Sequence, residues 1–198
     1  MRRTLTTMTA ALLLWLTASA AAALTPTETV KSRVDAALQS LSQVGPEASE
    51  RRHAEIRRAA DSLFDFPEMS RRALGRHWTD RTPAEREEFV RLFTELIAQS
   101  YIGKIDRYAG EPIAYTGERV DGDYASVRSE VVTAKGSQIP VEYRLRRANE
   151  SWTAYDVFIE NVSLVGTYRS QFNRVITTES FADLLRRLRE KGQVAEAR

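Results

Sequence analysis

The sequence contains no cysteine and only two histidines, His53 and His77, in its 198 residues. The missing thiols exclude a disulfide framework, thiol catalysis and a lipid-modified N-terminal cysteine. Two histidines far apart in the chain, with no cysteine to complement them, give poor support to a metal site. The protein therefore has to hold together by packing alone, and metal chemistry is not expected.

An excess of one charge is also missing once the N-terminus is set aside. The whole chain has 29 basic and 27 acidic residues, but its first 23 residues hold two arginines and no acid. The remainder is therefore balanced in charge, and the isoelectric point near 9.0 belongs only to the whole chain. A domain without a basic excess gives no reason to expect nucleic acid as a partner.

Long apolar runs are lacking as well. The apolar stretch at 10–16 is shorter than the roughly 20 residues that span a bilayer. It follows two arginines and precedes a series of small residues, which is the order of regions in a secretory signal peptide. We therefore expect residues 1–23 to be a signal peptide, cleaved after Ala20 or Ala23, and the protein to be exported.

Helical spacing dominates the first half of the mature chain. Thr27 is a candidate cap for a first helix, and Thr82 with Pro83 and Glu85 forms a second, clearer start with a capping box. Apolar residues follow this second start at three- and four-residue spacing, at Phe89, Phe93, Leu96, Ile97 and Tyr101. Such a wide apolar stripe is typical of a helix that packs on a core.

The apolar period changes to two between residues 111 and 160. Hairpin signals at 121–122, 135–136 and 149–150 divide this region into four expected strands, at about 112–120, 123–134, 137–147 and 151–160. Short turns between consecutive strands make an antiparallel meander. The sequence thus predicts a sheet that follows a set of helices.

Helical spacing then returns near the C-terminus. We expect helices at 162–176 and 181–188 and an end to the ordered chain at Gly192. The chain has no internal repeat and no low-complexity linker. We therefore expect one domain at 24–192, followed by a disordered tail at 193–198.

One face of the predicted sheet is apolar and the other is charged. The apolar face carries Ala125, Val127, Ser129, Val131, Ile139, Val141, Tyr143 and Leu145, and we expect Tyr155, Val157 and Ile159 of the last strand to join it. The opposite face carries Ser126, Arg128, Glu130, Glu142, Arg144 and Arg146. A sheet covered on one side by helices has this pattern. Periodicity does not distinguish a filled core from a cavity, so both interpretations stay open.

Catalytic signals are weak. The sequence has no nucleophile elbow, no phosphate-binding glycine loop and no dinucleotide fingerprint. Asp156 and Glu160 share a face of the last strand, where paired carboxylates can perform acid–base chemistry, but a strand end or a helix cap explains them more simply. Basic residues on amphipathic helices are also explained more simply, as the solvated faces of those helices, although one or two of them could contact a lipid phosphate. They are Arg71, Arg72, Arg76, Lys104 and Arg107.

Several motifs together resemble the MlaC family of periplasmic phospholipid-binding proteins, also called toluene-tolerance auxiliary components. The longest is the run 155–165, Tyr-Asp-Val-Phe-Ile-Glu-Asn-Val-Ser-Leu-Val, which is followed by Tyr-Arg-Ser-Gln-Phe at 168–172. The stretches 64–69, 74–78 and 82–101 agree with the family as well. Asn161 stands where the family often has glycine, and asparagine is the next-best residue for a left-handed backbone position.

The resemblance implies a fold and a role. The fold would be α+β, with a twisted four-stranded antiparallel sheet and helices packed on one face, NTF2-like, enclosing an apolar pocket. The role would be that of a periplasmic carrier that moves phospholipid between an outer-membrane lipoprotein–porin complex and the inner-membrane Mla ABC transporter complex, maintaining outer-membrane lipid asymmetry. Such a carrier is not an enzyme, has no cofactor besides its phospholipid cargo, and approaches membranes only transiently.

The candidate pocket residues are the aromatic and aliphatic side chains of the apolar helix and sheet faces. They are Phe89, Phe93, Ile97, Tyr101, Val127, Val131, Val141, Tyr143, Tyr155, Val157, Ile159, Tyr168 and Phe172. Two alternatives remain open at this point. One is an NTF2-like enzyme or small-ligand binder, for which the inward face offers Ser129, Tyr143 and Tyr155 as polar groups, and the other is a periplasmic adaptor that binds only protein.

Overall fold

The computed structural model describes residues 24–44, 49–105, 110–133, 136–149 and 151–196. The expected signal peptide and both of its expected cleavage positions lie outside these residues. The elements, in chain order, are α1 (Pro26–Ser42), α2 (Ser49–Leu63), α3 (Phe66–Leu74), a short 3-10 helix η1 (Gly75–His77), α4 (Pro83–Ile105), β1 (Ile113–Asp121), β2 (Tyr124–Val132), β3 (Gln138–Ala148), β4 (Ser151–Ile159), β5 (Val162–Ser163), α5 (Leu164–Thr178) and α6 (Phe181–Glu196).

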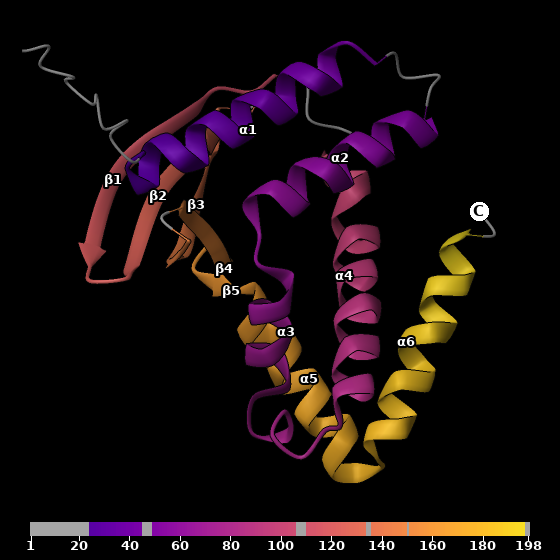
Figure 1. The fold of residues 1–198 in the computed structure, drawn as a ribbon. Coiled ribbons are helices and arrows are strands. Elements are labelled where there is room, and N and C mark those ends of the chain that lie inside the picture. The colour runs from indigo at the N-terminus through magenta and orange to yellow at the C-terminus, as the bar shows by residue number, and fades with distance from the viewer. Residues whose placement is uncertain (1–23, 45–48, 106–109, 134–135, 150, 197–198) are drawn as a thin grey trace, which may run out of the picture.

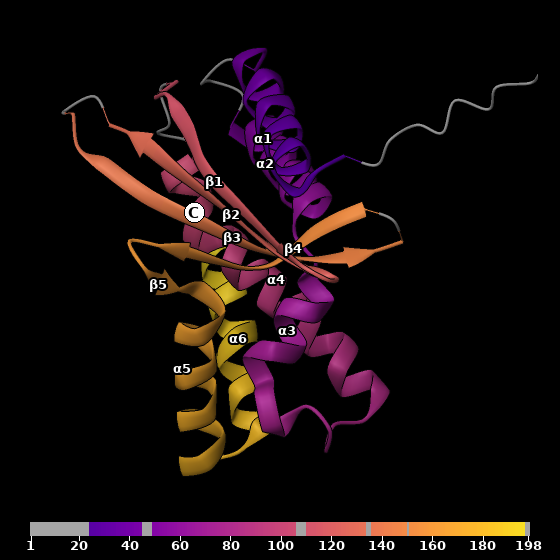
Figure 2. The same cartoon turned by 90° about the vertical axis from the view of Figure 1, so that its left-hand side faces the viewer.

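The strands form one antiparallel sheet in the order β1-β2-β3-β4-β5, which confirms the predicted α+β meander. The four expected strands are present, and the two-residue β5 adds a fifth that pairs with the end of β4. Asn161 lies in the turn before β5 with a φ of 65°, so the expected left-handed asparagine is confirmed. Figure 2 shows that the sheet twists strongly from β1 to β4.

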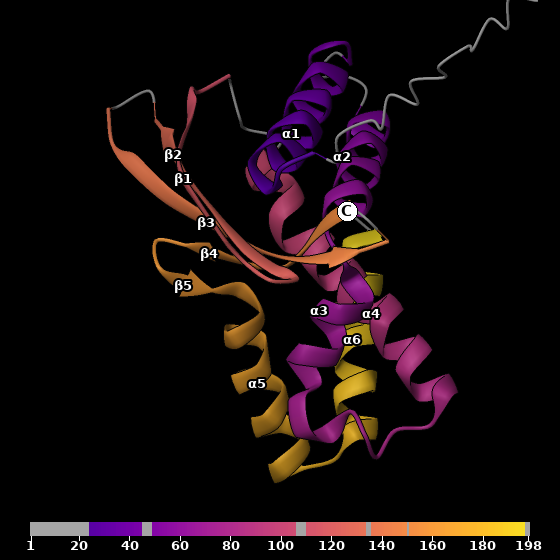
Figure 3. The same ribbon diagram turned by 60° about the vertical axis from the view of Figure 1, so that its left-hand side comes forward.

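The helices form two groups (Figures 1 and 3). The first group is α1 and α2, which pack on each other, and α1 also packs on β1, β2 and β4. The second group is a bundle of α3, α4, α5 and α6, in which α5 packs on β4 and β5. The long helix α4 contacts α2, α3 and α6 and thereby connects the two groups.

Two helix starts can be compared with the caps that the sequence predicts. The Thr82 hydroxyl accepts a hydrogen bond from the Glu85 amide at 3.3 Å, and the Glu85 carboxylate accepts one from the Thr82 amide at 2.8 Å. This capping box is therefore confirmed. The expected cap of the first helix is wrong: Thr25, not Thr27, caps α1, because only Thr25 has a glutamate three residues later, at Glu28. The Thr27 amide instead donates to Glu118 in β1, which ties the start of α1 to the sheet.

A bulge in β4 determines how the second group of helices meets the sheet. The register between β3 and β4 shifts at Arg144 and Leu145, which leaves Tyr155 as the extra residue. The chain between α2 and α3 runs beside β4 at this place, where the Asp65 amide donates to the Ala154 carbonyl at 2.8 Å. The start of α3 is therefore anchored to the edge of the sheet.

The last helix is longer than expected. It passes through Gly192 and ends at Glu196, whereas the sequence predicts an end of order at Gly192. A glycine inside a helix costs only about 1 kcal/mol relative to alanine. The helix-forming residues that follow it, Gln193 to Glu196, are enough to continue the helix for one more turn.

The buried apolar residues fall into three clusters. The largest fills the bundle and includes Met69, Phe89 and Phe93. A second joins α1 to the sheet through Val30, Val127 and Leu145, together with Leu63, Ala125, Trp152 and Ala154. The third is small and consists of Leu41 and Ile56 against Ala98. Among the described residues, Phe64 and Tyr143 pack against both large clusters and connect them.

Candidate functional site

The apolar face of the sheet is organised in transverse rows set by the strand register. One row pairs Ala125, Leu145 and Ala154, the next pairs Val127, Tyr143 and Val157, a third pairs Ser129, Val141 and Ile159, and a fourth pairs Val131 and Ile139. These pairings confirm that the predicted apolar residues of the second and third strands share one face. The four rows follow one another along the strands, from the end near α1 to the opposite end.

Burial decreases steadily from the first row to the last. Val127 and Leu145 are fully buried, with 0% of their surface exposed. In the third and fourth rows, Val131, Ile139, Val141 and Ile159 are only half-buried. We call these four residues the open half of the sheet face. Four partly exposed aliphatic side chains therefore lie close together at this end of the face, where an apolar ligand could cover them.

The covered end of the face is closed by α1. Val30 of α1 packs with Val127 and Leu145 in the second cluster. Arg33, one turn later, donates at 2.9 Å to the Trp152 carbonyl and at 2.9 Å to the Ser151 hydroxyl. These bonds fix α1 over the first rows, so the uncovered part of the face begins where α1 no longer reaches.

Two tyrosines, Tyr101 of α4 and Tyr168 of α5, lie at the margin of the bundle cluster, against which Val141 and Ile159 of the open half also pack. Tyr101, Val141 and Ile159 are all half-buried at the margin of the bundle cluster. Burial raises the pKa of the Tyr101 phenol above its ordinary value, with a smaller contribution from Tyr168. The Tyr168 hydroxyl donates to the Ser100 hydroxyl at 3.2 Å and so connects α5 to α4. The candidate site is thus the open half of the sheet face, which adjoins the bundle cluster through Val141 and Ile159.

Tyr143 lies at the boundary between the covered rows and the open half. Its side chain packs against both large clusters, and Phe64, from the link between α2 and α3, does the same. The Tyr143 hydroxyl hydrogen-bonds the Ser129 side chain, and burial raises the pKa of this phenol to about 12. Ser129 in turn donates to the Val141 carbonyl at 3.2 Å. The phenol is therefore held in place across two strands.

The structure separates the predicted pocket residues into groups. Val131, Val141, Tyr143 and Ile159 lie in or beside the open half, whereas Ile97 is buried in the bundle cluster and Tyr101 packs against it. Phe89, Phe93 and Phe172 instead pack on one another in the bundle, with ring centroids 5.3 to 5.7 Å apart, and Tyr168 joins them. Val127 and Val157 are buried within the second row. The aromatic stripe of α4 is thus mainly bundle core.

Tyr155 requires a correction, because the structure does not place it on the apolar face. Its ring meets the ring of Tyr124 edge-on at 6.0 Å, and the Arg72 guanidinium lies 3.8 Å from its centroid. Tyr124 pairs with Arg146, so both lie on the charged face. The bulge inserts one residue into β4, and strict alternation then assigns the wrong face to the residue at the bulge.

Sequence reasoning missed some residues that border the site. Ile139 was recognised on the apolar face but not named as a pocket residue, although alternation places it beside Val131. Phe64 carried no periodic signal because it lies in the link before α3.

The paired carboxylates are structural. Asp156 is buried and accepts hydrogen bonds from the amides of Val157 and Val165 and from the Ser163 hydroxyl, at 2.8, 3.0 and 2.6 Å. It therefore fixes the start of α5. Glu160 is exposed in the following turn with a φ of 51°. These hydrogen bonds to Asp156 come from two backbone amides and from Ser163, the cap of α5, which is the helix-cap role that the sequence favours.

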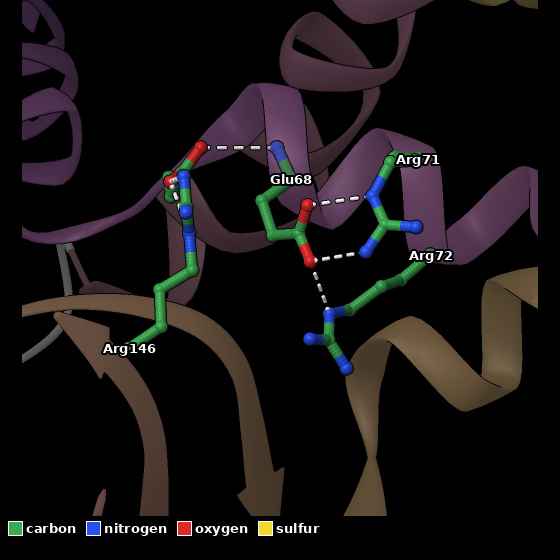
Figure 4. A network of polar contacts seen from close by, with 5 residues as sticks. Glu68, Arg71, Arg72 and Arg146 are labelled. Atoms are coloured by element: carbon green, nitrogen blue, oxygen red, sulfur yellow. Dashed lines mark hydrogen bonds and ion pairs between the residues drawn. The ribbon is translucent and has the colours of Figure 1, made fainter. Parts of the chain in front are cut away.

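The arginines considered for a lipid phosphate are also engaged elsewhere. Arg71 and Arg72 both donate to Glu68, and these bonds, with Arg71 contributing most, hold the pKa of the Glu68 carboxyl below its usual value even though burial acts in the opposite direction (Figure 4). Arg76 donates to Asn173 at 3.0 Å. The side chains of Lys104 and Arg107 lie outside the described part of the structure.

The helical bundle contains two clefts among its described residues. One, of about 480 Å³, lies between α4, α5 and α6 beside Phe172 and Leu188, and the other, of about 400 Å³, lies between η1 and α5 beside His77 and Asn173. Both are lined by helical residues and are distinct from the open half of the sheet face. Within the described ranges, acidic and histidine side chains form no cluster suited to a metal ion. None of the helices described is long and apolar enough to cross a bilayer.

The architecture defines an α+β protein in which a twisted antiparallel sheet and a helical bundle meet along a partly uncovered apolar face. The sequence profile described as MlaC protein matches residues 28–190. Because this match extends over most of the sequence, the chain belongs to the MlaC family.

Two relatives give this assignment more detail. The Intermembrane phospholipid transport system binding protein MlaC of Haemophilus influenzae is 23% identical over 126 residues, which are 61% of this chain and 59% of that relative. The chain thus matches only about three fifths of that relative's length. The solved structure of the phospholipid-binding protein from Ralstonia solanacearum, in complex with a phospholipid, has a TM-score of 0.75 and 26% identity, and the match covers 85% of this chain and 97% of that one.

Proposed function

We propose that this protein is a periplasmic phospholipid carrier that holds acyl chains against the open half of the sheet face and carries out no reaction. The observation that supports this most is the group of four half-buried aliphatic residues on the open half, Val131, Ile139, Val141 and Ile159. The family match and the phospholipid complex of the similar Ralstonia protein support the choice of ligand.

Physical chemistry constrains how such a carrier operates. Each buried methylene contributes about 0.8 kcal/mol relative to water, so two full acyl chains would exceed the limit of about 18 to 21 kcal/mol for noncovalent affinity. Free lipid in water is therefore not the relevant state. The relevant exchange is between the apolar site and a bilayer, which are similar solvents for an acyl chain.

This balance explains why no catalytic group is needed. We propose that lipid enters and leaves only where a membrane complex opens the site, at an outer-membrane lipoprotein–porin complex and at the inner-membrane Mla ABC transporter. Direction then comes from the transporter. The name of the Haemophilus relative, which places that protein in an intermembrane phospholipid transport system, supports this part of the proposal.

Native mass spectrometry of the protein purified from the periplasm without detergent tests the proposal. We expect a noncovalent adduct whose mass equals one or more phospholipids and which is released on denaturation. Protein stripped of lipid by organic solvent and then refolded serves as the control, and it should regain the adduct after incubation with phospholipid vesicles. A protein that is empty as isolated and stays empty after this incubation would favour the enzyme or the adaptor instead.

A further inference from the structure

Tyr143 occupies the position at which an acyl chain on the open half would have to end. Val141 and Ile139, the next inward-facing residues along β3, are half-buried, whereas Leu145 on its other side is fully buried beneath α1. The same change occurs on β2, from the half-buried Val131 to the fully buried Val127. On β2 the buried part already begins at Ser129, which is 2% exposed and contacts the Tyr143 side chain, so the boundary runs through Tyr143 and Ser129.

The phenol ring is fixed at this boundary by contacts on several sides. Its hydroxyl hydrogen-bonds Ser129 on the neighbouring strand, and Ser129 is itself 2% exposed and bonded to the Val141 carbonyl. The ring packs against the bundle cluster on one side and the α1 cluster on the other. A side chain constrained in this way cannot swing aside without breaking a buried hydrogen bond.

Behind Tyr143 there is no room for more ligand among the described residues. Val30, Val127 and Leu145 are each 0% exposed and in contact within one cluster. Close-packed interiors of this kind resist the insertion of even a few methylenes. The end of the site is therefore a wall made of side chains, with the Tyr143 ring as its exposed surface.

We infer that the Tyr143 ring, packed between the bundle cluster and the α1 cluster, is the end stop that sets the longest acyl chain this protein carries well. The inference rests on the proposed function, because it requires a phospholipid whose chains lie along the open half of the sheet face. Chains that reach the ring fill the site, and longer chains have to leave methylenes outside it. Each methylene that gains or loses burial changes relative binding about fourfold.

Variants at this position separate ring volume from hydroxyl bonding. Tyr143→Leu and Tyr143→Ala remove the ring, and a cavity the size of a benzene ring, on the order of 150 Å³, is large enough to take an apolar guest. Tyr143→Phe keeps the ring and removes only the hydrogen bond. Phe172→Leu is the matched control, since it removes a ring from the aromatic cluster of the bundle instead.

The experiment offers each stripped protein an equimolar vesicle mixture of phospholipids that share one headgroup and differ only in acyl length, and then measures the bound species by mass spectrometry. We expect Tyr143→Leu and Tyr143→Ala to shift the bound lipids to longer chains, by up to about fourfold for each added methylene. Tyr143→Phe and Phe172→Leu should keep the wild-type distribution.

The outcomes distinguish this inference from the proposed function. If Tyr143→Leu binds as much lipid as the wild type with an unchanged length distribution, the end stop is wrong while the carrier function stands. If the wild-type protein binds no lipid from the vesicles, both are wrong. Should Tyr143→Ala fail to fold, Tyr143→Leu alone decides, because it replaces the ring with a smaller apolar side chain.

Discussion

Arg146 in β3 and Asp65 at the start of α3 form an ion pair although 81 residues separate them in sequence. Both Nε and a terminal nitrogen of Arg146 donate to one Asp65 oxygen, while the other oxygen accepts the Glu68 amide at 3.0 Å (Figure 4). Asp65 therefore caps α3 and also attaches it to the charged face of the sheet. This one carboxylate therefore contributes to the attachment of α3 to the sheet.

Replacing Asp65 with alanine should be costly for stability. The lost cap accounts for about 1 kcal/mol, and a partly buried arginine without its partner adds about 1 to 3 kcal/mol. Arg146→Ala should cost less, since the cap remains. Urea unfolding of both single variants and the double variant measures the coupling. A cost for Asp65→Ala within the roughly 0.5 kcal/mol of an ordinary surface substitution would contradict this role.

The depressed pKa of Glu68 predicts a pH dependence. Its folded-state pKa is lower than its unfolded value, so its contribution is fully present above the unfolded pKa of about 4.3 and is lost as pH falls through the folded value. Glu68→Gln should therefore destabilise the protein by about 1 kcal/mol at pH 7 and by much less near pH 3. Urea midpoints at the two pH values provide the measurement, and an equal cost at both would exclude the ion pairs as the cause.

Asp156 should matter for stability and not for chemistry. Asp156→Ala removes the acceptor of three hydrogen bonds and leaves two buried amides without a partner, which should cost about 2 to 4 kcal/mol. Asp156→Asn should cost less, because its amide oxygen can still accept from the backbone. Thermal unfolding checks the order of the two variants. If the asparagine variant were the less stable, backbone hydrogen bonding would not be the main role.

Headgroup selectivity should be weak. Arg71 and Arg72 donate hydrogen bonds to Glu68, and Arg76 donates one to Asn173. Binding a lipid phosphate would require these arginines to give up such bonds. Lipids extracted from the purified protein should then match the headgroup composition of the membrane that supplied them. Enrichment of one headgroup by about tenfold, equivalent to 1.4 kcal/mol, would indicate a specific polar site that this account lacks.

The sequence predicts the sheet well and the site only in part. Alternation placed Val127, Val131, Val141 and Tyr143 on one face, because antiparallel strands with one solvated side follow a strict period of two. Tyr155 was misplaced, since a bulge shifts this period by one and has no clear signal in the sequence.

Helix patterns were informative about burial and not about cavities. Phe89, Phe93 and Phe172 have the spacing of an apolar stripe, and that stripe packs within the bundle. Whether a buried stripe meets another helix or a ligand depends on the arrangement of distant elements. The division of the core into three clusters arises from this arrangement, so no local pattern could predict it.

Val141 tests the central claim because it lies in the middle of the open half of the sheet face. In a filled core, Val141→Trp would cost about 1 to 3 kcal/mol through overpacking and leave any lipid elsewhere undisturbed. Beside a lipid, the added ring takes space that the acyl chain otherwise fills. Glu142→Ala and Arg119→Trp, on the charged face, serve as controls and should change lipid content little.

The most direct measurement is the amount of phospholipid that co-purifies with Val141→Trp, expressed per mole of protein and compared with the wild type alongside the thermal midpoint. The account predicts a clear loss of bound lipid with a small change in stability. A badly destabilised variant that still carries a full lipid load would show that this face is ordinary core and that lipid binds elsewhere.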